Sequence, residues 1–327
     1  MRKKIFITGG AGYVGSVLVP SLLKSGHEVT VYDLMIYGDK VLKPHENLTL
    51  IKNDIRNTEK LNESLKGHDI VIHLACISND PSFELNPNLG KSINLDSFRP
   101  LVEISRKCEV NRFIFASSSS VYGIKNERNV SEEMSLKPLT DYSKYKADCE
   151  TILKEYESND FDTAIIRPAT VCGYSPRQRL DVVVNIFTNF AFHNRKINIF
   201  GGDQLRPNIN IKDMVRSYHL LIDAEKDQIK GQIFNAGDKN YKVSELATMV
   251  KSVVGNDVTL LKSHSNDNRS YHISSQKIFD RLGFKIENTI LDAIIDLKDA
   301  FEKKKLIDPL NNIEYYNIKM MQKLNLK

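Results

Sequence analysis

Short apolar runs alternate with longer stretches of helical periodicity through the first half of the chain. The runs are rich in β-branched residues and predict strands over residues 4–8, 28–33, 48–52, 69–74, 112–117 and 163–167. Between them, apolar residues recur at helical spacing and predict helices over residues 14–24, 58–65, 89–107 and 142–157. Short apolar strands separated by helices are typical of a parallel sheet with helices on both faces. We therefore expect a doubly wound α/β fold.

The alternation becomes less regular from residue 171 onward. Glycine-containing turns begin at residues 173, 201 and 237, and helices are predicted over residues 181–193, 212–224 and 243–253. We therefore divide the chain into a first domain, 1–173, and a smaller C-terminal lobe, 174–327. The lobe should close over the carboxyl ends of the strands, where ligands of such sheets bind, and segments of it should return to the first domain. The tail after Ile307 is rich in Asn and Lys, and its sequence predicts no particular role.

Composition narrows the class of protein. A chain of 327 residues can form one large α/β unit or two packed lobes, and 41% hydrophobic with 27% charged residues is ordinary globular composition. The net charge of +5 is spread along the chain, which favours small anionic ligands over nucleic acid. No apolar run is long enough to span a membrane. The cysteines lack metal-ligand and disulfide spacing, so we expect a soluble, cytoplasmic protein without a metal; they are Cys76, Cys108, Cys149 and Cys172.

The stretch GGAGYVG contains two overlapping glycine patterns. It fits G-x-G-x-x-G through Gly10, Gly12 and Gly15, and G-x-x-G-x-x-G through Gly9, Gly12 and Gly15. A chance glycine turn is the alternative, but this stretch follows a predicted strand and opens a predicted helix, whose N-terminus favours a diphosphate. The next strand ends in Asp33, whose carboxylate can accept hydrogen bonds from a ribose and repel a 2′-phosphate. The pattern predicts a Rossmann-type domain that binds NAD rather than NADP.

A second constellation is Tyr-x-x-x-Lys, formed by Tyr142 and Lys146 on a predicted helix. Residues four apart share a helix face, whereas Lys144 and Tyr145 lie on other faces. A tyrosine with its ordinary pKa near 10 is a poor base at neutral pH, but a nearby lysine and an oxidised nicotinamide lower that pKa. The alternative is an exposed basic helix. The run of four serines in FASSSSVYG either begins a loop or places one serine for chemistry.

Taken together, these motifs resemble a known family. The ordered set TGGAGYVG, Asp33, NDI, HLA, SSSSVYG and Y-x-x-x-K is similar to the extended short-chain dehydrogenase/reductases that act on nucleotide sugars, the group of UDP-glucose 4-epimerase and the nucleotide-sugar dehydratases. The resemblance runs from residue 1 to about residue 285. It implies that Ser118 hydrogen-bonds the reacting sugar hydroxyl and holds it against Tyr142, and that Ser120 helps to position the substrate. Ser117 and Ser119 are expected to be structural.

The resemblance also implies binding residues, while His73 is expected to be a packing residue. The residues expected to bind NAD are Gly9, Gly12, Tyr13, Val14, Gly15, Asp33, Leu34, Asp54, Ile55, Leu74, Ala75, Ser78, Tyr142, Lys146 and Pro168. Those expected at the substrate are Ser118, Ser120, Thr170, Arg179, Arg206 and Arg269. Arginine suits a diphosphate because its planar fork makes two hydrogen bonds, although a solvated loop arginine is the alternative for each. Arg177 and Arg179 cannot be ranked against each other.

Departures from the family narrow the reaction. Dehydratases of the group carry Asp-Glu where this chain has Ser119 and Ser120, and related decarboxylases and 3,5-epimerases carry Glu or Cys at Ser120. Serine cannot do that acid–base work at neutral pH. What remains is Ser118, Tyr142, Lys146 and NAD, a set that oxidises a sugar hydroxyl, usually at carbon 4.

The fate of the keto sugar stays open between a 4-dehydrogenase and a 4-epimerase. The segments HLACISNDPSFELNP, RPATVCGYSPRQRLDVVVN and GGDQLRPNINIKD, with Thr170 where most of the family has Asn, resemble a branch in bacterial surface-polysaccharide (capsule) biosynthesis. That branch includes enzymes that oxidise carbon 4 of GDP-linked manno-heptose, which favours the dehydrogenase. A non-catalytic NAD-binding regulator is a third hypothesis. The resemblance implies a homodimer or tetramer through a four-helix bundle, built from the helix after Asn94 and the helix carrying Tyr142.

Overall fold

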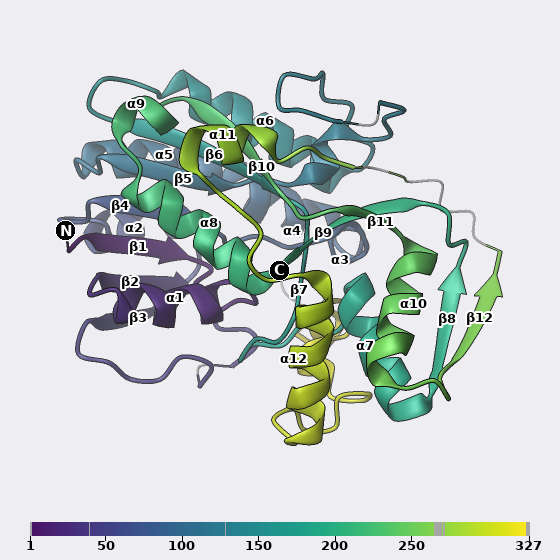
Figure 1. The fold of residues 1–327 in the computed structure, drawn as a ribbon. Coiled ribbons are helices and arrows are strands. Elements are labelled where there is room, and N and C mark those ends of the chain that lie inside the picture. The colour runs from purple at the N-terminus through teal and green to yellow at the C-terminus, as the bar shows by residue number, and fades with distance from the viewer. Residues whose placement is uncertain (1, 39, 128, 265–269, 271, 325–327) are drawn as a thin grey trace.

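The computed structural model describes residues 2–38, 40–127, 129–264, 270 and 272–324. Its centre is a seven-stranded sheet in the order β10-β6-β5-β4-β1-β2-β3, with every neighbouring pair parallel (Figure 1). The strands are β1 (Lys4–Thr8), β2 (Glu28–Asp33), β3 (Leu48–Lys52), β4 (Ile70–His73), β5 (Arg112–Ala116), β6 (Asp162–Pro168) and β10 (Gln232–Ala236). The prediction of a doubly wound α/β fold is confirmed.

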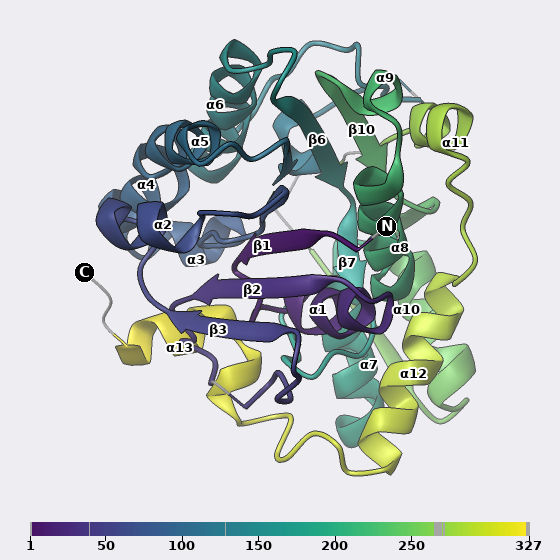
Figure 2. The same cartoon turned by 90° about the vertical axis from the view of Figure 1, so that its left-hand side faces the viewer.

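Helices cover both faces of this sheet (Figure 2). Because successive side chains of a strand point to opposite faces, Ile5 and Ile7 pack in one core cluster and Phe6, between them, packs in another. The first cluster includes residues of α1 (Gly15–Lys24) and α8 (Ile211–Asp223), and the second lies under α2 (Thr58–Ser64), α5 (Phe98–Lys107) and α6 (Asp141–Glu155). Burial on both faces explains why the strands appear in the sequence as continuous apolar runs.

The helix predicted over residues 89–107 is interrupted. It consists of α4 (Pro87–Lys91), the π-helical turn η1 (Ser92–Asp96) and α5. Within the turn, the Asn94 side chain accepts a hydrogen bond from the Ile77 N–H at 2.8 Å and donates to the Ile77 carbonyl at 3.0 Å. These bonds tie the π-helical turn to the loop after β4, and such turns are frequent near functional sites. Periodicity alone does not reveal this interruption.

The C-terminal lobe has two small sheets that the sequence pattern did not predict. A three-stranded sheet has the order β11-β9-β7, and β12 pairs with β8. Their bounds are β7 (Thr170–Cys172), β8 (Lys196–Phe200), β9 (Leu205–Asn210), β11 (Asn240–Lys242) and β12 (Thr259–Ser263). Three helices pack together in a core cluster of this lobe: α7 (Val183–Asn194), α10 (Val243–Val254) and α12 (Ile290–Glu302).

Segments from the second half return to the first domain. Strand β10 pairs with β6 at the edge of the main sheet, and α8 packs on α1. After α12 the chain returns to the first domain, where it forms the C-terminal helix α13 (Asn317–Leu324). Helix α13 contacts α3 (Asp80–Glu84) (Figure 2). The remaining short helices are α9 (Lys226–Ile229), α11 (Gln276–Leu282), η2 (Ser119–Tyr122) and η3 (Ile313–Tyr315). Within the described ranges, no helix is long and apolar enough to cross a membrane.

Candidate active site

A large pocket of about 650 Å³ lies at the carboxyl ends of the central strands. From β1 the chain adds β2 and β3 on one side of the sheet, and then β4, β5 and β6 on the other side. Ligands of open α/β sheets bind at the carboxyl ends of the strands where this order reverses. Of the residues expected at the cofactor or substrate, those that line it are Gly9, Gly12, Tyr13, Val14, Gly15, Asp33, Leu34, Ile55, Leu74, Ala75, Ser78, Ser118, Ser120, Tyr142, Lys146, Pro168, Thr170, Arg179 and Arg206.

The glycine turn forms one wall of the pocket. Gly9 has a φ of 74°, and a Cβ there would lie 2.5 Å from the Ala75 nitrogen. A Cβ at Gly15 would lie 2.4 Å from the Gly10 carbonyl oxygen. A Cβ at Gly12 would meet only the Gly9 carbonyl oxygen at 3.1 Å, and would otherwise project into open space. Gly9 and Gly15 therefore allow the chain to pack, while Gly12 leaves room for a diphosphate at the start of α1.

Asp33 is held rigidly at the end of β2. Its Oδ2 accepts a hydrogen bond from the Ala11 N–H at 2.9 Å, and its Oδ1 accepts one from the Met35 N–H at 2.7 Å. Burial raises the pKa of this carboxyl, and the two backbone donors oppose that rise. Each oxygen keeps a further lone pair for a ribose hydroxyl. The geometry fits a dinucleotide whose adenosine ribose lies beside Asp33.

One residue expected at the adenine does not contribute to the pocket lining. Asp54 is absent from the lining, and its carboxylate pairs with Arg56 at 2.7 Å. Its neighbours Asn53 and Ile55 do line the pocket. Arg269, expected at the substrate diphosphate, lies outside the described residues.

Two segments bring the reactive side chains together. Ser118 caps η2, where its Oγ accepts a hydrogen bond from the Ser120 N–H at 3.2 Å and lies 2.9 Å from the Ser120 Oγ. Tyr142 and Lys146 come from α6, whose start is fixed by a capping box between Thr140 and Ser143. Such a cap satisfies free N–H groups in the first turn, so Tyr142 is held at a well-ordered helix end.

The environment of Tyr142 keeps its hydroxyl protonated in the cofactor-free protein. Burial raises the pKa of Tyr142 well above its ordinary value, while the Arg179 charge and a hydrogen bond with Ser118 lower it. Lys146 is buried, donates to the Ala116 carbonyl at 2.7 Å and lies over the Phe115 ring at 4.8 Å. The ammonium is therefore held against the end of β5.

The other serines and the neighbouring helix residues have structural contacts. Ser117 donates to Glu150 at 2.5 Å, and Ser119 is buried at the start of η2. Lys144 is exposed and pairs with Asp141, and Tyr145 packs against Phe83. His73 is buried, with its ring 2.7 Å from the Thr8 hydroxyl.

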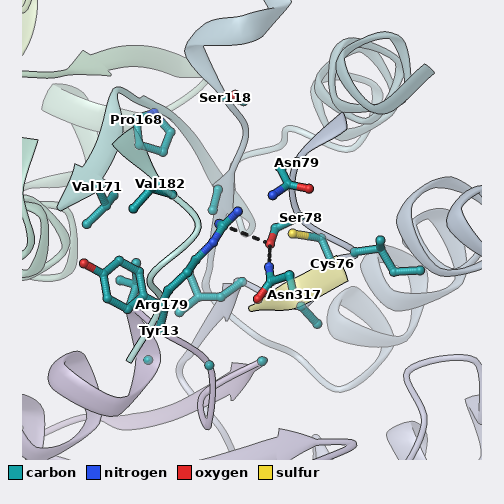
Figure 3. Close-up of a pocket in the computed structure, with 18 of the residues that line it drawn as sticks. Tyr13, Cys76, Ser78, Asn79, Ser118, Pro168, Val171, Arg179, Val182 and Asn317 are labelled. Atoms are coloured by element: carbon teal, nitrogen blue, oxygen red, sulfur yellow. Dashed lines mark hydrogen bonds between the residues drawn. The ribbon is translucent and has the colours of Figure 1, made fainter. Parts of the chain in front are cut away.

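Cationic side chains also line the pocket. Arg179 pairs with Asp181 at 2.6 Å and donates to the Ser78 hydroxyl at 3.3 Å (Figure 3). Arg206 extends from β9 into the lining. Arg177 also lines the pocket and is 4% exposed. Sequence reasoning missed Asn317 entirely, although it donates to Ser78 at 2.9 Å (Figure 3), because nothing local marks a residue from so distant a helix.

Comparisons with known proteins agree with this geometry. Residues 5–237 match the model of the NAD dependent epimerase/dehydratase family. An uncharacterized UDP-glucose epimerase of Bacillus subtilis, YtcB, is 32% identical over 79% of this chain and 84% of its own length.

Solved structures are also similar. The UDP-N-acetylglucosamine 4-epimerase of Methanobrevibacter ruminantium in complex with UDP-N-acetylmuramic acid has a TM-score of 0.84 at 26% identity, covering 93% of this chain and 99% of its own. The UDP-glucose 4-epimerase of Thermotoga maritima has a TM-score of 0.83 at 24% identity, covering 93% of this chain and all of its own, and supports the fold. With the glycine turn, Asp33 and the Ser–Tyr–Lys set around one pocket, the chain belongs to the NAD-dependent epimerase/dehydratase family.

Proposed function

We propose that this protein uses NAD to oxidise the carbon-4 hydroxyl of a nucleoside-diphosphate sugar to a ketone. The observation that carries the proposal is the position of Ser118, Tyr142 and Lys146 on a pocket that continues past Gly12 to Asp33. A sugar hydroxyl beside Tyr142 and a dinucleotide along the glycine turn would then share one continuous space. NAD, when bound, supplies the acceptor for the hydride that leaves carbon 4.

The residues of this chain provide the proton chemistry. The Ser118 hydroxyl holds the sugar hydroxyl, and the Tyr142 phenolate takes its proton as the hydride leaves. Lys146 stabilises that phenolate, since a fixed ammonium lowers the pKa of a neighbouring phenol. Its bond to the Ala116 carbonyl keeps the charge in place, and among the described residues no carboxylate forms an ion pair with it. Excluding water in the pocket strengthens these interactions.

Elimination of water is not part of the proposal. Ser119 and Ser120 offer hydroxyls where dehydratases of the family carry Asp-Glu. Among the described residues that line the pocket, each carboxylate already accepts a hydrogen bond. Asp33 accepts backbone N–H groups, Asp181 accepts from Arg179, and Asp80 accepts from the Thr140 hydroxyl at 2.6 Å.

For the substrate and product, we propose a 4-dehydrogenase acting on GDP-linked manno-heptose or a related hexose in surface-polysaccharide biosynthesis. Support comes from the segments that resemble this branch, and from Thr170 on the pocket wall where most of the family has Asn. The second candidate is a 4-epimerase of UDP-sugars, which is favoured by relatives and solved structures that carry this name.

One incubation separates these candidates. The purified protein is mixed with GDP-linked heptose or a UDP-hexose, together with an external oxidant for NADH, and products are analysed by mass spectrometry and NMR. A product lighter by two hydrogen atoms supports the 4-dehydrogenase, and an unchanged mass with inverted carbon 4 supports the epimerase. A product lighter by one water would contradict both, and binding of NAD without turnover would favour a regulator.

We also propose a homodimer, or a tetramer built from it, through α5 and α6. These helices pack against each other and expose one common side, on which Arg99 of α5 pairs with Glu155 of α6 at 2.9 Å. Two copies would form a four-helix bundle. Light scattering after size exclusion gives the mass, and Thr151→Arg on the exposed side of α6 should reduce it to that of a monomer.

A further inference from the structure

A part of the pocket wall next to the glycine turn is built from two distant parts of the chain. One is the segment 174–182 between β7 and α7, and the other is α13. We propose that Arg177 and Asn317, which we call the clamp, hold the diphosphate of bound NAD against the glycine turn and keep the cofactor on the protein between turnovers. Neither residue is needed for the proton chemistry, so the clamp is a binding device separate from Tyr142.

The segment that carries Arg177 is attached directly to the glycine turn. The Tyr13 hydroxyl donates to the Gly173 carbonyl at 2.7 Å, and the Ser175 hydroxyl donates to the Tyr13 carbonyl at 2.7 Å. The Arg177 N–H itself donates to the Ser16 hydroxyl in the first turn of α1 at 3.1 Å. These bonds hold Arg177 near the helix N-terminus where a diphosphate would sit.

The guanidinium of Arg177 is a buried cation with unused hydrogen-bonding capacity. It lies 3.5 Å from the centroid of the Tyr37 ring, and its Nη2 donates to the Asn317 Oδ1 at 2.5 Å. Its Nε has no hydrogen-bond partner, and within the described ranges no carboxylate forms an ion pair with it. Asp33 is close enough for the Arg177 charge to act on its pKa, yet both Asp33 oxygens already accept backbone bonds.

A buried charge without a counter-ion is unfavourable, and an anion in the pocket would remove that cost. A diphosphate suits the guanidinium because charged oxygens accept two parallel N–H bonds. The neighbouring Arg179 differs, since Asp181 already neutralises it at 2.6 Å. Among the described residues, Arg177 is therefore a buried cation of the lining without an ion pair, which an anionic ligand would neutralise.

Asn317 joins the two walls of the pocket. Its Nδ2 donates to the Ser78 hydroxyl after β4 at 2.9 Å, its Oδ1 accepts from Arg177, and its N–H donates to the Asp181 Oδ2 at 2.9 Å. Figure 3 shows Arg179 and Asn317 approaching Ser78 from different directions. These contacts place α13 across the cleft, and α13 lies beyond the residues that match the family model.

Helix α13 has its own anchors, so a side-chain change at Asn317 need not release it. Met321 is buried in the core cluster under the main sheet, and the hydroxyl of Tyr316, just before α13, accepts a hydrogen bond from Asn189 of α7 at 3.0 Å. Gln322, also on α13, is exposed and provides a matched control amide. Removing the Asn317 amide should therefore loosen the clamp while the helix stays docked.

The test measures release of the cofactor without any sugar. Protein loaded with NADH is mixed with excess NAD, and the loss of bound-NADH fluorescence gives the release rate. We expect Asn317→Ala and Arg177→Gln to release NADH at least about tenfold faster than the unaltered protein, as is typical for losing hydrogen bonds to charged groups. Gln322→Ala should match the unaltered protein, and Arg177→Lys, which keeps the charge but loses the fork, should fall between.

Equal release rates for Asn317→Ala and Gln322→Ala in folded proteins would overturn the proposal. Circular dichroism of the cofactor-free proteins checks folding. If Asn317→Ala does not fold, the NADH release rate of Arg177→Lys is compared with that of the unaltered protein instead. A second arm measures the affinity of NAD-loaded protein for GDP and UDP, which should not change. If those affinities fall while NADH release does not, Arg177 serves the diphosphate of the substrate instead and the clamp is disproved. No sugar is used, so the result is independent of the proposed reaction.

Discussion

At the scale of single residues, the hydroxyl of Tyr142 is the group that we propose takes the proton of the sugar hydroxyl. Burial raises its pKa, while the Arg179 charge and a hydrogen bond with Ser118 lower it. Two surrounding hydroxyls differ in their contacts: Ser118 hydrogen-bonds Tyr142, whereas Ser119 is buried at the start of η2. Substitutions of Ser118 and Ser119 can therefore test the proposed mechanism against a neighbouring control.

We expect Tyr142→Phe to lower turnover by about 10²–10⁴-fold, the usual contribution of a general acid–base group, without preventing binding of the nucleotide sugar. Ser118→Ala should lose much of the rate, and Ser119→Ala, the adjacent control, far less. Initial rates of NADH formation and calorimetry of nucleotide-sugar binding give the two quantities. Near-normal turnover in Tyr142→Phe would refute the mechanism.

A second residue-scale prediction concerns His73. Burial lowers the pKa of His73 to about 3, whereas an unfolded histidine has a pKa near 6.5. Below pH 6.5 the unfolded chain binds a proton at His73, whereas the folded protein binds that proton only near pH 3. The free energy of unfolding is therefore highest above pH 6.5 and falls as the pH is lowered from 6.5 toward 3. This residue should lower the free energy of unfolding by up to about 1.4 kcal/mol per pH unit in that window.

Urea unfolding followed by circular dichroism at several pH values between 7 and 5 tests this expectation. The dependence of unfolding free energy on pH should be shallower in His73→Gln than in the unaltered protein, because other titrating groups are common to both. If the free energy of unfolding depends on pH equally in both proteins, His73 has the same protonation state in the folded and the unfolded chain, and the prediction is wrong.

At the scale of elements, one buried ion pair connects α6 to the main sheet. Arg167 of β6 pairs with Glu150 of α6 at 2.6 Å, both side chains being 3% exposed, and it also donates to the Tyr122 hydroxyl of η2 at 2.7 Å. The elements that carry Tyr142 and follow Ser118 are thereby held together. Replacing one partner leaves the other charge buried and unpaired.

Arg167→Met should therefore lower the free energy of unfolding by about 3–5 kcal/mol. The control is Arg99→Met, which breaks the exposed pair with Glu155 and should change it by less than about 1 kcal/mol. Denaturant titration of both variants provides the comparison. Similar small effects in the two would mean that the buried pair contributes little to the attachment of α6.

Elements with a strong local pattern were predictable. Strand β1 and helix α1 each carry their own periodicity, and a glycine turn marks the boundary between them. Strand β9 was not predicted, since Leu205-Arg-Pro-Asn-Ile-Asn contains Pro207 and two asparagines, which are disfavoured in strands, and it pairs as a strand with β7 and β11. The π-helical turn η1 also depends on a tertiary contact, that of Asn94 with Ile77.

The candidate site divides in the same way. Three parts of the site are short motifs whose residue spacing predicts their relative positions: the glycine turn, Asp33 at the end of the next strand, and Tyr-x-x-x-Lys on one helix face. Arg177 and Arg179 could not be ranked, because spacing along a loop does not tell which arginine has a carboxylate partner. Asn317 was unpredictable, since its role exists only after α13 has crossed to Ser78.

At the scale of the whole molecule, the division at residue 173 does not separate two independent cores. One core cluster combines Ile5 and Ile7 of β1 with Met214 of α8 and Phe234 of β10. The fragment 1–173 alone would expose the edge of β6 and the apolar residues that α8 covers. The two parts should therefore unfold together.

We expect differential scanning calorimetry to show a single transition with equal calorimetric and van't Hoff enthalpies, the criterion of two-state unfolding. The fragment 1–173, expressed by itself, should lack the cooperative transition. Two resolved transitions in the full chain, or a folded fragment 1–173, would contradict this expectation and support independent domains.

The clamp also sets an order of events during synthesis. Ser78 and Asn317 stand 239 positions apart, so a ribosome adding about 5–20 residues per second needs roughly 10–50 s to produce the second after the first. During that interval the glycine turn and Asp33 lack the side of the pocket that α13 supplies. The contact between Ser78 and Asn317 can form only after α13 has been made, so the cofactor site is complete only in the finished chain.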